Sequence, residues 1–181
     1  MKAIVVYESM FGSTHRMAVA IAEGLSAAGE VHVVRAADVE PGALEGADLL
    51  VVGCPTHAWS MPRTSTRKGA PSYVSKPGSD LTLEPGADTA PGVREWLASL
   101  PEVPLAAAAF DTRIAMSPML TGRASRAISR LLRRKGARLL AEPESFLVDK
   151  RSHLLPGEAD RARRWGAEIA SDYGRVVATA G

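Results

Sequence analysis

Glu8-Ser9-Met10-Phe11-Gly12-Ser13-Thr14 is the stretch that decides the fold, because a strand ends and a helix begins within it. The apolar run before it, residues 3–7, is typical of a short buried strand, and apolar residues recur at the helical period from Met17 to Leu25. A helix N-terminus presents unpaired N–H groups and the positive end of the helix dipole, so this turn could hold a phosphate group. The same residues also suit an ordinary turn that is capped by Ser13 or Thr14.

The rest of the chain alternates between apolar runs and helical patterns. Four further stretches read as strands, the last broken at Pro143: 31–34, 49–53, 105–110, and 137–142 with 145–148. Helical patterns occupy 93–100, 122–135 and 159–173, whereas Pro41-Gly42 allows only a short helix within 38–47. The alternation predicts an α/β fold in one domain over residues 1–181. Its five parallel strands would lie in the doubly wound order 2-1-3-4-5, with helices on both faces.

Residues 62–91 interrupt this alternation. The segment is rich in proline, serine and glycine and has no sustained periodicity. A loop of this length is unusual inside a compact domain. We interpret 62–91 as an irregular insertion at the periphery of the fold. We expect a short linker to replace residues 67–87 without loss of the fold, because loop closure costs little free energy.

Composition narrows the possible classes of protein. No apolar run approaches the roughly 20 residues of a membrane span, and the N-terminus enters a strand directly, so we expect no signal peptide and no membrane insertion. The single cysteine, Cys54, excludes an internal disulfide and favours the cytoplasm. A net charge of +2 is no evidence for nucleic-acid binding.

Several classes that share this architecture require motifs that the chain lacks. Neither G-x-x-x-x-G-K-[ST] nor G-x-G-x-x-G is present, which excludes the P-loop NTPases and the dinucleotide-binding fold. A receiver domain needs acidic residues after two strands, and only Glu8 fits. A cysteine phosphatase needs an arginine where Ser60 stands, so we interpret Cys54 as a small buried residue. No cluster of His, Cys, Asp and Glu has metal-ligand spacing.

Three loops should meet at one edge of the sheet. In an open parallel sheet, ligands bind beyond the carboxyl ends of the strands, at the point where the strand order reverses. The first, third and fourth strands end there in residues 9–14, 55–59 and 111–113. The sequence therefore predicts a binding site made by these three loops.

These loops resemble those of the flavodoxin-like proteins. Ser9-Met10-Phe11-Gly12-Ser13-Thr14 is similar to the family's [ST]-x-x-G-x-T phosphate loop, although Phe11 stands where a hydroxyl is common. Pro55-Thr56-His57-Ala58-Trp59, after Gly53, is similar to the loop over one flavin face, and Asp111-Thr112-Arg113 follows the strand where the third flavin loop begins. The resemblance covers nearly the whole chain apart from 62–91. It implies FMN as the cofactor, with its phosphate in the first loop.

The resemblance also implies roles for individual residues, each with a plainer alternative. Trp59 would stack on the flavin ring, or would cover the core as Trp96 and Trp165 are expected to do. His57 would contact the flavin edge, or would face solvent. Asp111 and Thr112 would meet the pyrimidine part of the flavin. Arg113 would place positive charge near it, or would be an exposed loop arginine.

Backbone geometry in the second loop bears on the redox behaviour that the resemblance implies. Flavodoxins commonly flip a peptide in this loop when the flavin takes up one electron, and the flip needs a residue that tolerates positive φ. No glycine occurs between Gly53 and Gly69. A positive φ at Ala58 or Trp59 would cost on the order of 1 kcal/mol or more. We therefore expect reduction close to a single two-electron step.

The helix at 122–135 carries an unusual density of positive charge. Its cations, with one just beyond it, are Arg123, Arg126, Arg130, Arg133, Arg134, Lys135 and Arg138. They form a solvated outer face or a docking face for an acidic partner.

Three functions follow from the resemblance. The first is an FMN protein that transfers electrons to a redox partner. The second is an FMN-dependent NAD(P)H or quinone-type reductase that uses a small electron acceptor. The third is a binding module of the same fold that lacks flavin. The sequence does not indicate the oligomeric state.

Overall fold

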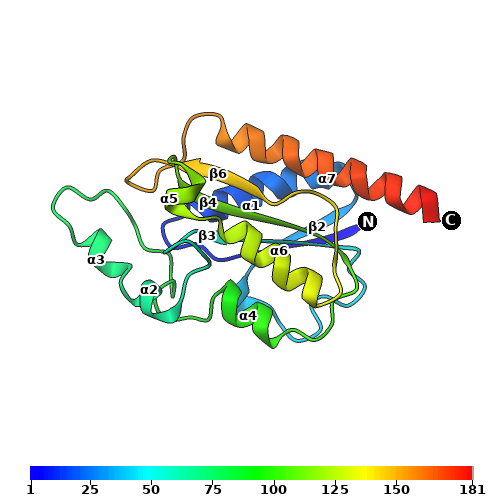
Figure 1. The fold of residues 1–181 in the computed structure, drawn as a ribbon, viewed down its shortest axis with the longest axis horizontal. Helices are drawn as coiled ribbons and strands as arrows, with labels where there is room; N and C mark the ends of the chain where they lie inside the picture. The colour runs from blue at the N-terminus through cyan, green and yellow to red at the C-terminus, as the bar shows by residue number, and fades with distance from the viewer. Residues whose placement is uncertain (181) are drawn as a thin grey trace.

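A parallel sheet organises the computed structural model, which describes residues 1–180 (Figure 1). Its strands are β1 Lys2–Tyr7, β2 Glu30–Arg35, β3 Leu49–Pro55, β4 Ala106–Ile114, β5 Arg138–Leu139 and β6 Glu144–Val148. They lie in the order β2-β1-β3-β4, and β4 pairs with β5 near its start and with β6 near its end. The predicted order 2-1-3-4-5 is confirmed, with the fifth position shared by two short strands. Pro143 lies between them and has no N–H to donate to a ladder.

Helices cover both faces of the sheet. One face carries α1 Ser13–Leu25 and α7 Glu158–Ala180, and the other carries α4 Val93–Ser99 and α6 Ala124–Arg134. Successive residues of a strand point to opposite faces, so Val5 packs under α1 and α7 while Val6 packs under α4 and α6. Trp96 and Trp165 are buried in these two cores, as predicted.

Short helical turns complete the connections. They are the 3₁₀ turns η1 Ser26–Ala28 and η2 Ala36–Asp38, and the short helices α2 Thr64–Lys68, α3 Pro71–Val74 and α5 Pro118–Thr121. Within residues 38–47, where we expected a short helix, Asp38 ends η2 and residues 41–46 form turns instead. Pro41-Gly42 explains this difference, since Gly42 has φ 81° and ends any helical run. Among the described residues, no helix combines the length and the apolar character needed to cross a bilayer.

The insertion leaves the sheet at its carboxyl edge. It contains α2 and α3 and then runs without regular structure to residue 92. Figure 1 shows α3 and the chain after it projecting beyond the ends of the strands. The insertion therefore lies on the side of the sheet where the three predicted loops end.

Candidate functional site

The three predicted loops meet at one cavity of about 290 Å³ at the carboxyl edge of the sheet. Predicted residues that line it are Ser9, Met10, Phe11, Ser13, Thr14, Pro55, Thr56, His57, Ala58, Thr112 and Arg113. Gly12, Trp59 and Asp111 are not part of the lining. The volume is close to the lower end for small-molecule sites, which are commonly about 300–1,000 Å³.

The first loop, residues 9–14, leads into α1, and the N-terminus of this helix has no side-chain cap. Gly12 precedes the helix with φ 87°, and its N–H donates to the Ser9 Oγ at 3.1 Å. Gly12 has no side chain to cap the helix, and neither Ser13 nor Thr14 is the N-cap residue. The alternative of an ordinary turn capped by Ser13 or Thr14 is therefore wrong. The N–H groups of the first turn have no carbonyl partner within the helix, so they stay available to a ligand.

The hydroxyls of the first loop connect it to its neighbours. Ser13 Oγ donates to the carbonyl of Ser152 at 2.5 Å, and Thr14 Oγ1 lies 2.7 Å from Thr112 Oγ1. A hydroxyl has one donor and two acceptor positions, so only one of the two threonines donates to the other. The other threonine keeps its proton for a further partner. The pair therefore joins the first loop to β4 and still leaves one donor free.

The second loop adopts the geometry that we expected it to avoid. Ala58 has φ 45° and Trp59 has φ 67°, both in the left-handed region. The loop is a tight hairpin in which the His57 N–H donates to the Ser60 carbonyl at 2.8 Å and the Ser60 N–H donates back at 3.0 Å. Tight hairpin turns of this kind need positive φ at both central residues. The premise of the two-electron prediction was wrong, because the folded chain already holds the conformation whose cost we counted.

Gly122 explains how this hairpin is held. The backbones of Trp59 and Gly122 pair side by side, and a Cβ added at Gly122 would lie 2.3 Å from the Cα of Trp59. Trp59 is 65% exposed, so it does not cover the core. Stacking of Trp59 on a flavin stays a prediction.

The side chains of Asp111 and Arg113, at the end of β4, have different surroundings. Asp111 is fully buried and its Oδ2 accepts the backbone N–H of Ser125 at 2.8 Å, so it faces α6 rather than the cavity. Burial raises the pKa of this carboxyl. Arg113 lines the cavity and donates from Nη1 to the carbonyl of Met116 at 2.7 Å. Burial lowers the pKa of Arg113, but a guanidinium remains charged at neutral pH.

His57 contributes a neutral polar group to the cavity. It is half-buried, and burial lowers its pKa from the ordinary value of 6.5. Its ring is therefore uncharged at pH 7. Arg113 is consequently the one cation among the predicted residues that line the cavity.

Sequence reasoning missed several residues of the cavity wall. They are Tyr73, Leu81, Ile114, Val148, Lys150 and Ser152. Val148 ends β6, and Lys150 and Ser152 lie two and four residues after it. The rule that ligands bind beyond the carboxyl ends of strands would have found them if it had been applied to the last strand. Tyr73 and Leu81 belong to the insertion, where no periodic signal marks them. Tyr73 also lies 6.3 Å from Phe11, measured between ring centroids.

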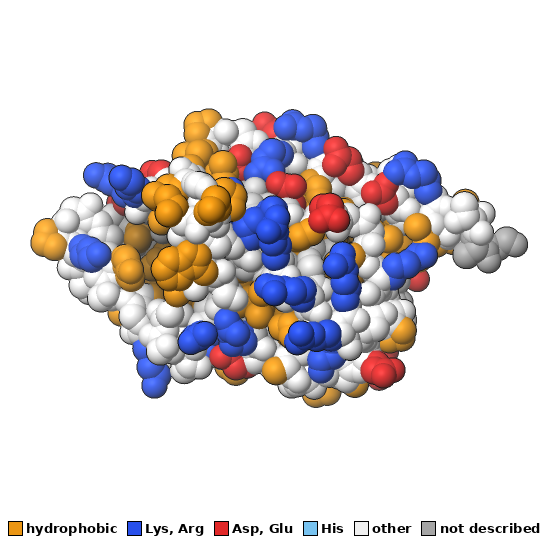
Figure 2. Space-filling view, viewed as in Figure 1, with side chains coloured by type: hydrophobic (Ala, Val, Ile, Leu, Met, Phe, Trp, Pro, Cys, Tyr) orange, Lys and Arg blue, Asp and Glu red, His pale blue; other side chains and the backbone are white. Residues whose placement is uncertain are grey.

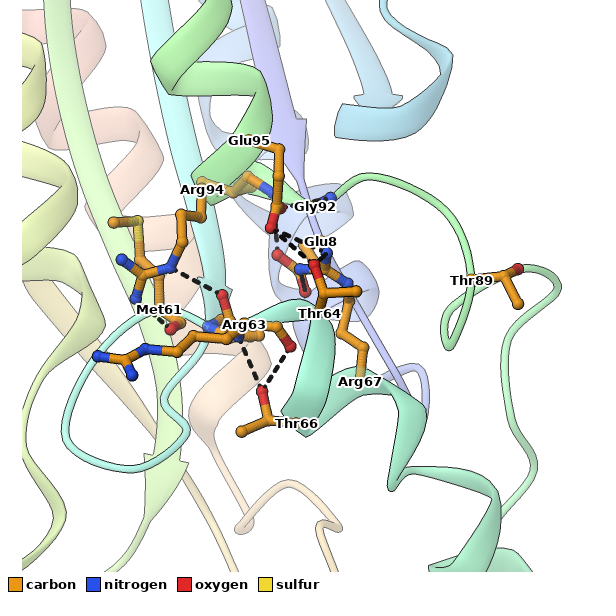
Figure 3. Close-up of polar contacts among 12 residues, drawn as sticks. Glu8, Met61, Arg63, Thr64, Thr66, Arg67, Thr89, Gly92, Arg94 and Glu95 are labelled. Carbon is orange, nitrogen blue, oxygen red and sulfur yellow. Dashed lines mark hydrogen bonds and ion pairs between the residues drawn. The ribbon is translucent and has the colours of Figure 1, made fainter.

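A buried ion network anchors the insertion to the sheet (Figure 3). Arg67 of α2 has a side chain only 3% exposed, with Nη1 3.6 Å from Glu8 Oε1 and Nη2 3.0 Å from Glu95 Oε1. Glu8, which follows β1, accepts the N–H of Val93 at 2.9 Å. We therefore expect replacement of residues 67–87 to lower the stability of the fold, contrary to the sequence-based expectation, because deleting Arg67 would leave Glu8 buried without a cation.

Two neighbouring contacts support this network. Arg94 of α4 donates to the carbonyl of Met61 at 2.6 Å and to that of Pro62 at 3.0 Å, which fixes the start of the insertion (Figure 3). Gly92 leaves room for the ion pair, since a Cβ there would lie 2.3 Å from Glu8 Oε2. The network thus joins β1, α2 and α4.

An exposed apolar patch lies beside the second loop and over α5. Its members are Trp59, Ile114, Met116, Met119 and Leu120, of which Met119 is 89% exposed. Figure 2 shows hydrophobic side chains gathered over α5 and basic side chains gathered over α6 next to them. Four cations of α6 are exposed, and so is Arg138 of β5: Arg126, Arg130, Arg133, Arg134 and Arg138. Arg123 and Lys135 instead donate to backbone carbonyls of other segments.

Other features of the chain do not form the site. A larger cavity of about 590 Å³ lies between residues 39–45 and 99–105, at the opposite edge, where strands begin. Cys54 is fully buried, as predicted, and burial raises the pKa of its thiol. Within residues 1–180, no group of three His, Cys, Asp or Glu side chains could hold a metal ion.

Comparison with known proteins agrees with this geometry. A family model described as flavodoxin matches residues 5–66, which include the first loop and the second. The match spans about a third of the chain, and it supports the flavodoxin-like family. The family resemblance inferred from the three loops is thereby confirmed.

Solved structures extend the likeness in fold to nearly the whole length of this chain. A flavodoxin from the domain Archaea is 24% identical with a TM-score of 0.64, and the match covers 96% of this chain and 99% of that one. Flavodoxin 1 from Bacillus cereus is 18% identical with a TM-score of 0.64, over 94% and 98% of the two chains. A flavodoxin, WrbA-like protein from Agrobacterium tumefaciens is 18% identical with a TM-score of 0.60, over 96% and 98%. At these identities the likeness establishes the fold.

Proposed function

We propose that this flavodoxin-like chain binds FMN and transfers electrons to a redox partner protein. The observation that carries the proposal is the meeting of all three loops at one cavity beside an uncapped helix N-terminus. A helix start of this kind suits a phosphate, because its free N–H groups and its dipole both favour an anion. The family model supports a role in flavin-based electron transfer.

The chemistry of the cavity wall fits such a cofactor. Ser9, Ser13 and Thr14 bring hydroxyls to the end of the cavity formed by the first loop, where Thr14 also meets Thr112 of β4. Met10, Phe11, Tyr73, Leu81 and Ile114 bring apolar surface for an aromatic ring system. A phosphorylated aromatic ligand requires hydrogen-bond donors for its phosphate at one end of the site. It requires apolar walls with few polar groups around its ring.

Each part of the site would have a separate task. The first loop would hold the phosphate, and the hairpin 57–60 would form one wall for the ring. Tyr73 and Leu81 of the insertion would exclude water from the cavity. Arg113 would contribute fixed positive charge, which favours the reduced and more negative form of the cofactor, while His57 stays neutral. When bound, FMN would supply the redox chemistry itself.

The partner that we propose is an acidic protein with an apolar centre at its contact surface. The apolar patch offers Met and Trp side chains, which pack against varied surfaces, and the exposed cations of α6 border it (Figure 2). Complementary charge would steer an acidic partner and orient it at the edge of the cavity. The single, fully buried cysteine accords with a cytoplasmic location, which we also propose.

The insertion favours a second function. Because Tyr73 and Leu81 extend the cavity wall, the site could admit a small electron acceptor, as an FMN-dependent reductase of the NAD(P)H or quinone type requires. Oxidation of NADPH by the FMN-loaded protein with a quinone, and without any added reductase, would establish this alternative. No turnover under these conditions would leave electron transfer to a protein as the function.

The test of flavin binding is an absorbance spectrum of the purified protein before and after FMN is added and unbound flavin removed. We expect flavin absorbance that stays with the protein at one FMN per chain. A spectrum without flavin at saturating FMN would overturn the proposal and favour the flavin-free binding module.

A further inference from the structure

The insertion returns to the sheet directly across the first loop. We call residues 80–84 the strap. The N–H of Glu84 donates to the carbonyl of Met10 at 2.8 Å, and Leu81 lines the cavity. The strap is thus in backbone contact with the loop that we propose for the phosphate.

A histidine–carboxylate pair fixes the strap on each side of this loop. At one end His15, in the first turn of α1, has Nδ1 3.1 Å from Glu84 Oε1. At the other end His153 has Nε2 3.3 Å from Asp80 Oδ1. The neighbouring Ser152 accepts the hydroxyl of Ser13, so this second contact also borders the first loop.

The two carboxylates differ in their relation to the helix N-terminus. A Cβ added at Gly12, the residue before α1, would lie 3.8 Å from Glu84 Oε1, and the Glu84 side chain is only 18% exposed. Glu84 therefore places a negative charge at the start of α1, where the helix dipole favours an anion. The Asp80 side chain is 59% exposed, and solvent screens its charge.

We propose that Glu84 is a specificity-determining residue of the flavin site and that it weakens the binding of the phosphate-bearing flavin. This inference rests on the proposed function, in which the first loop takes the phosphate. A carboxylate beside that loop repels a phosphate dianion and has no comparable effect on riboflavin, which lacks the phosphate. His15 moderates this repulsion as the direct partner of Glu84.

A consequence is that the chain discriminates less between FMN and riboflavin than its phosphate loop would by itself. The group responsible comes from the insertion and not from the loops that carry the family resemblance. The strap therefore couples the insertion to the choice of cofactor.

The experiment compares Glu84→Gln with Asp80→Asn, a matched change at the other end of the strap. Both variants and the parent are titrated at low ionic strength with FMN and with riboflavin, and binding is followed by quenching of flavin fluorescence. We expect Glu84→Gln to raise the preference for FMN over riboflavin roughly tenfold, and Asp80→Asn to change it less than about twofold. An unchanged preference in Glu84→Gln, or an equal rise in both variants, would overturn the proposal without affecting flavin binding itself.

A double-mutant cycle tests the part assigned to His15. In the parent, His15→Asn should weaken FMN binding because Glu84 loses its partner. In the Glu84→Gln background the same change should have little effect. Equal losses in both backgrounds would show that His15 acts on the phosphate directly, contrary to the proposal.

Inorganic phosphate gives a readout that does not depend on flavin. Amide NMR shifts of Gly12, Ser13 and Thr14 report its binding to the flavin-free protein. We expect Glu84→Gln to bind phosphate more tightly than the parent. Equal phosphate affinity in the two proteins would contradict the proposal, whereas the absence of phosphate and flavin binding in both would overturn the assignment of the first loop as well.

Discussion

Replacing Arg67 by methionine tests the buried network that anchors the insertion. Methionine keeps most of the volume and the helix propensity of arginine but removes its charge. In the folded chain this change leaves the Glu8 carboxylate, 7% exposed, with the Val93 N–H as its remaining hydrogen-bond donor. Removal of one partner from a buried ion pair commonly costs about 3–5 kcal/mol. We expect Arg67→Met to lower the free energy of unfolding by about this amount at pH 7.

The pH dependence of this loss follows from the pKa of Glu8. Burial raises that pKa above its ordinary value of 4.5, while the Val93 N–H and Arg67 oppose the rise. Without Arg67 the folded-state pKa of Glu8 rises further. A raised pKa stabilises the folded chain at low pH, and this contribution is lost as the pH rises through the folded value. The loss in Arg67→Met should therefore be smaller at pH 5 than at pH 7.

Urea unfolding followed by tryptophan fluorescence measures this effect. One of the three tryptophans, Trp96, lies in α4 next to the network. Arg63→Met is the matched control, since Arg63 is an exposed arginine just before α2. Trypsin cleavage after Lys68, the last residue of α2, reports detachment of the insertion and should accelerate in Arg67→Met. Equal stability of the Arg67 and Arg63 variants, with unchanged cleavage, would refute the idea that the network anchors the insertion.

Three further predictions concern the loops and the surface. Thr14→Val should weaken FMN binding by about 1–3 kcal/mol and leave riboflavin binding unaffected. Thr112→Val, which breaks the same hydroxyl pair, should not alter the preference for FMN over riboflavin. Fluorescence titration measures both variants, and equal effects of Thr14→Val on the two flavins would contradict the phosphate assignment. Gly122→Ala should lower the free energy of unfolding in urea by about 1–3 kcal/mol more than Gly136→Ala does. Both glycines have positive φ, but only Gly122 lies against Trp59. Equal losses in the two variants would show that the close contact is not the reason for glycine at this position. Replacing Arg126, Arg130 and Arg134, three exposed cations of α6, by glutamine should slow electron transfer to an acidic partner at low salt and flatten its salt dependence. An unchanged salt profile would show that α6 is only a solvated face.

Local sequence signals were sufficient for the fold and for the loops that end its strands. The turn at Gly12 carries its own markers, namely an apolar strand before it and a helical period after it. The split of the last strand followed from Pro143, which cannot donate to a ladder. Both features depend on residues adjacent in the chain, which is why the sequence alone revealed them.

Contacts between distant residues account for what the sequence did not reveal. Arg67 and Glu84 each meet residues of the β1–α1 region, but nothing in the sequence of the insertion assigns those partners. The positive φ values at Ala58 and Trp59 go against local preference and accompany a close contact with Gly122. Asp111 lies at the end of β4 but faces away from the cavity. The rule that ligands bind beyond the carboxyl ends of strands locates such a residue, but it does not predict toward which face of the sheet its side chain points.

Equilibrium titration of the flavin-free protein with FMN, with riboflavin as the paired ligand, tests the central claim most directly. The account predicts saturation at one FMN per chain, tighter binding of FMN than of riboflavin, and amide shifts at Gly12, Ser13 and Thr14 that FMN causes and riboflavin does not. Binding of both flavins with equal affinity and without those shifts would contradict a phosphate site at the start of α1, and no binding of either would contradict the function itself.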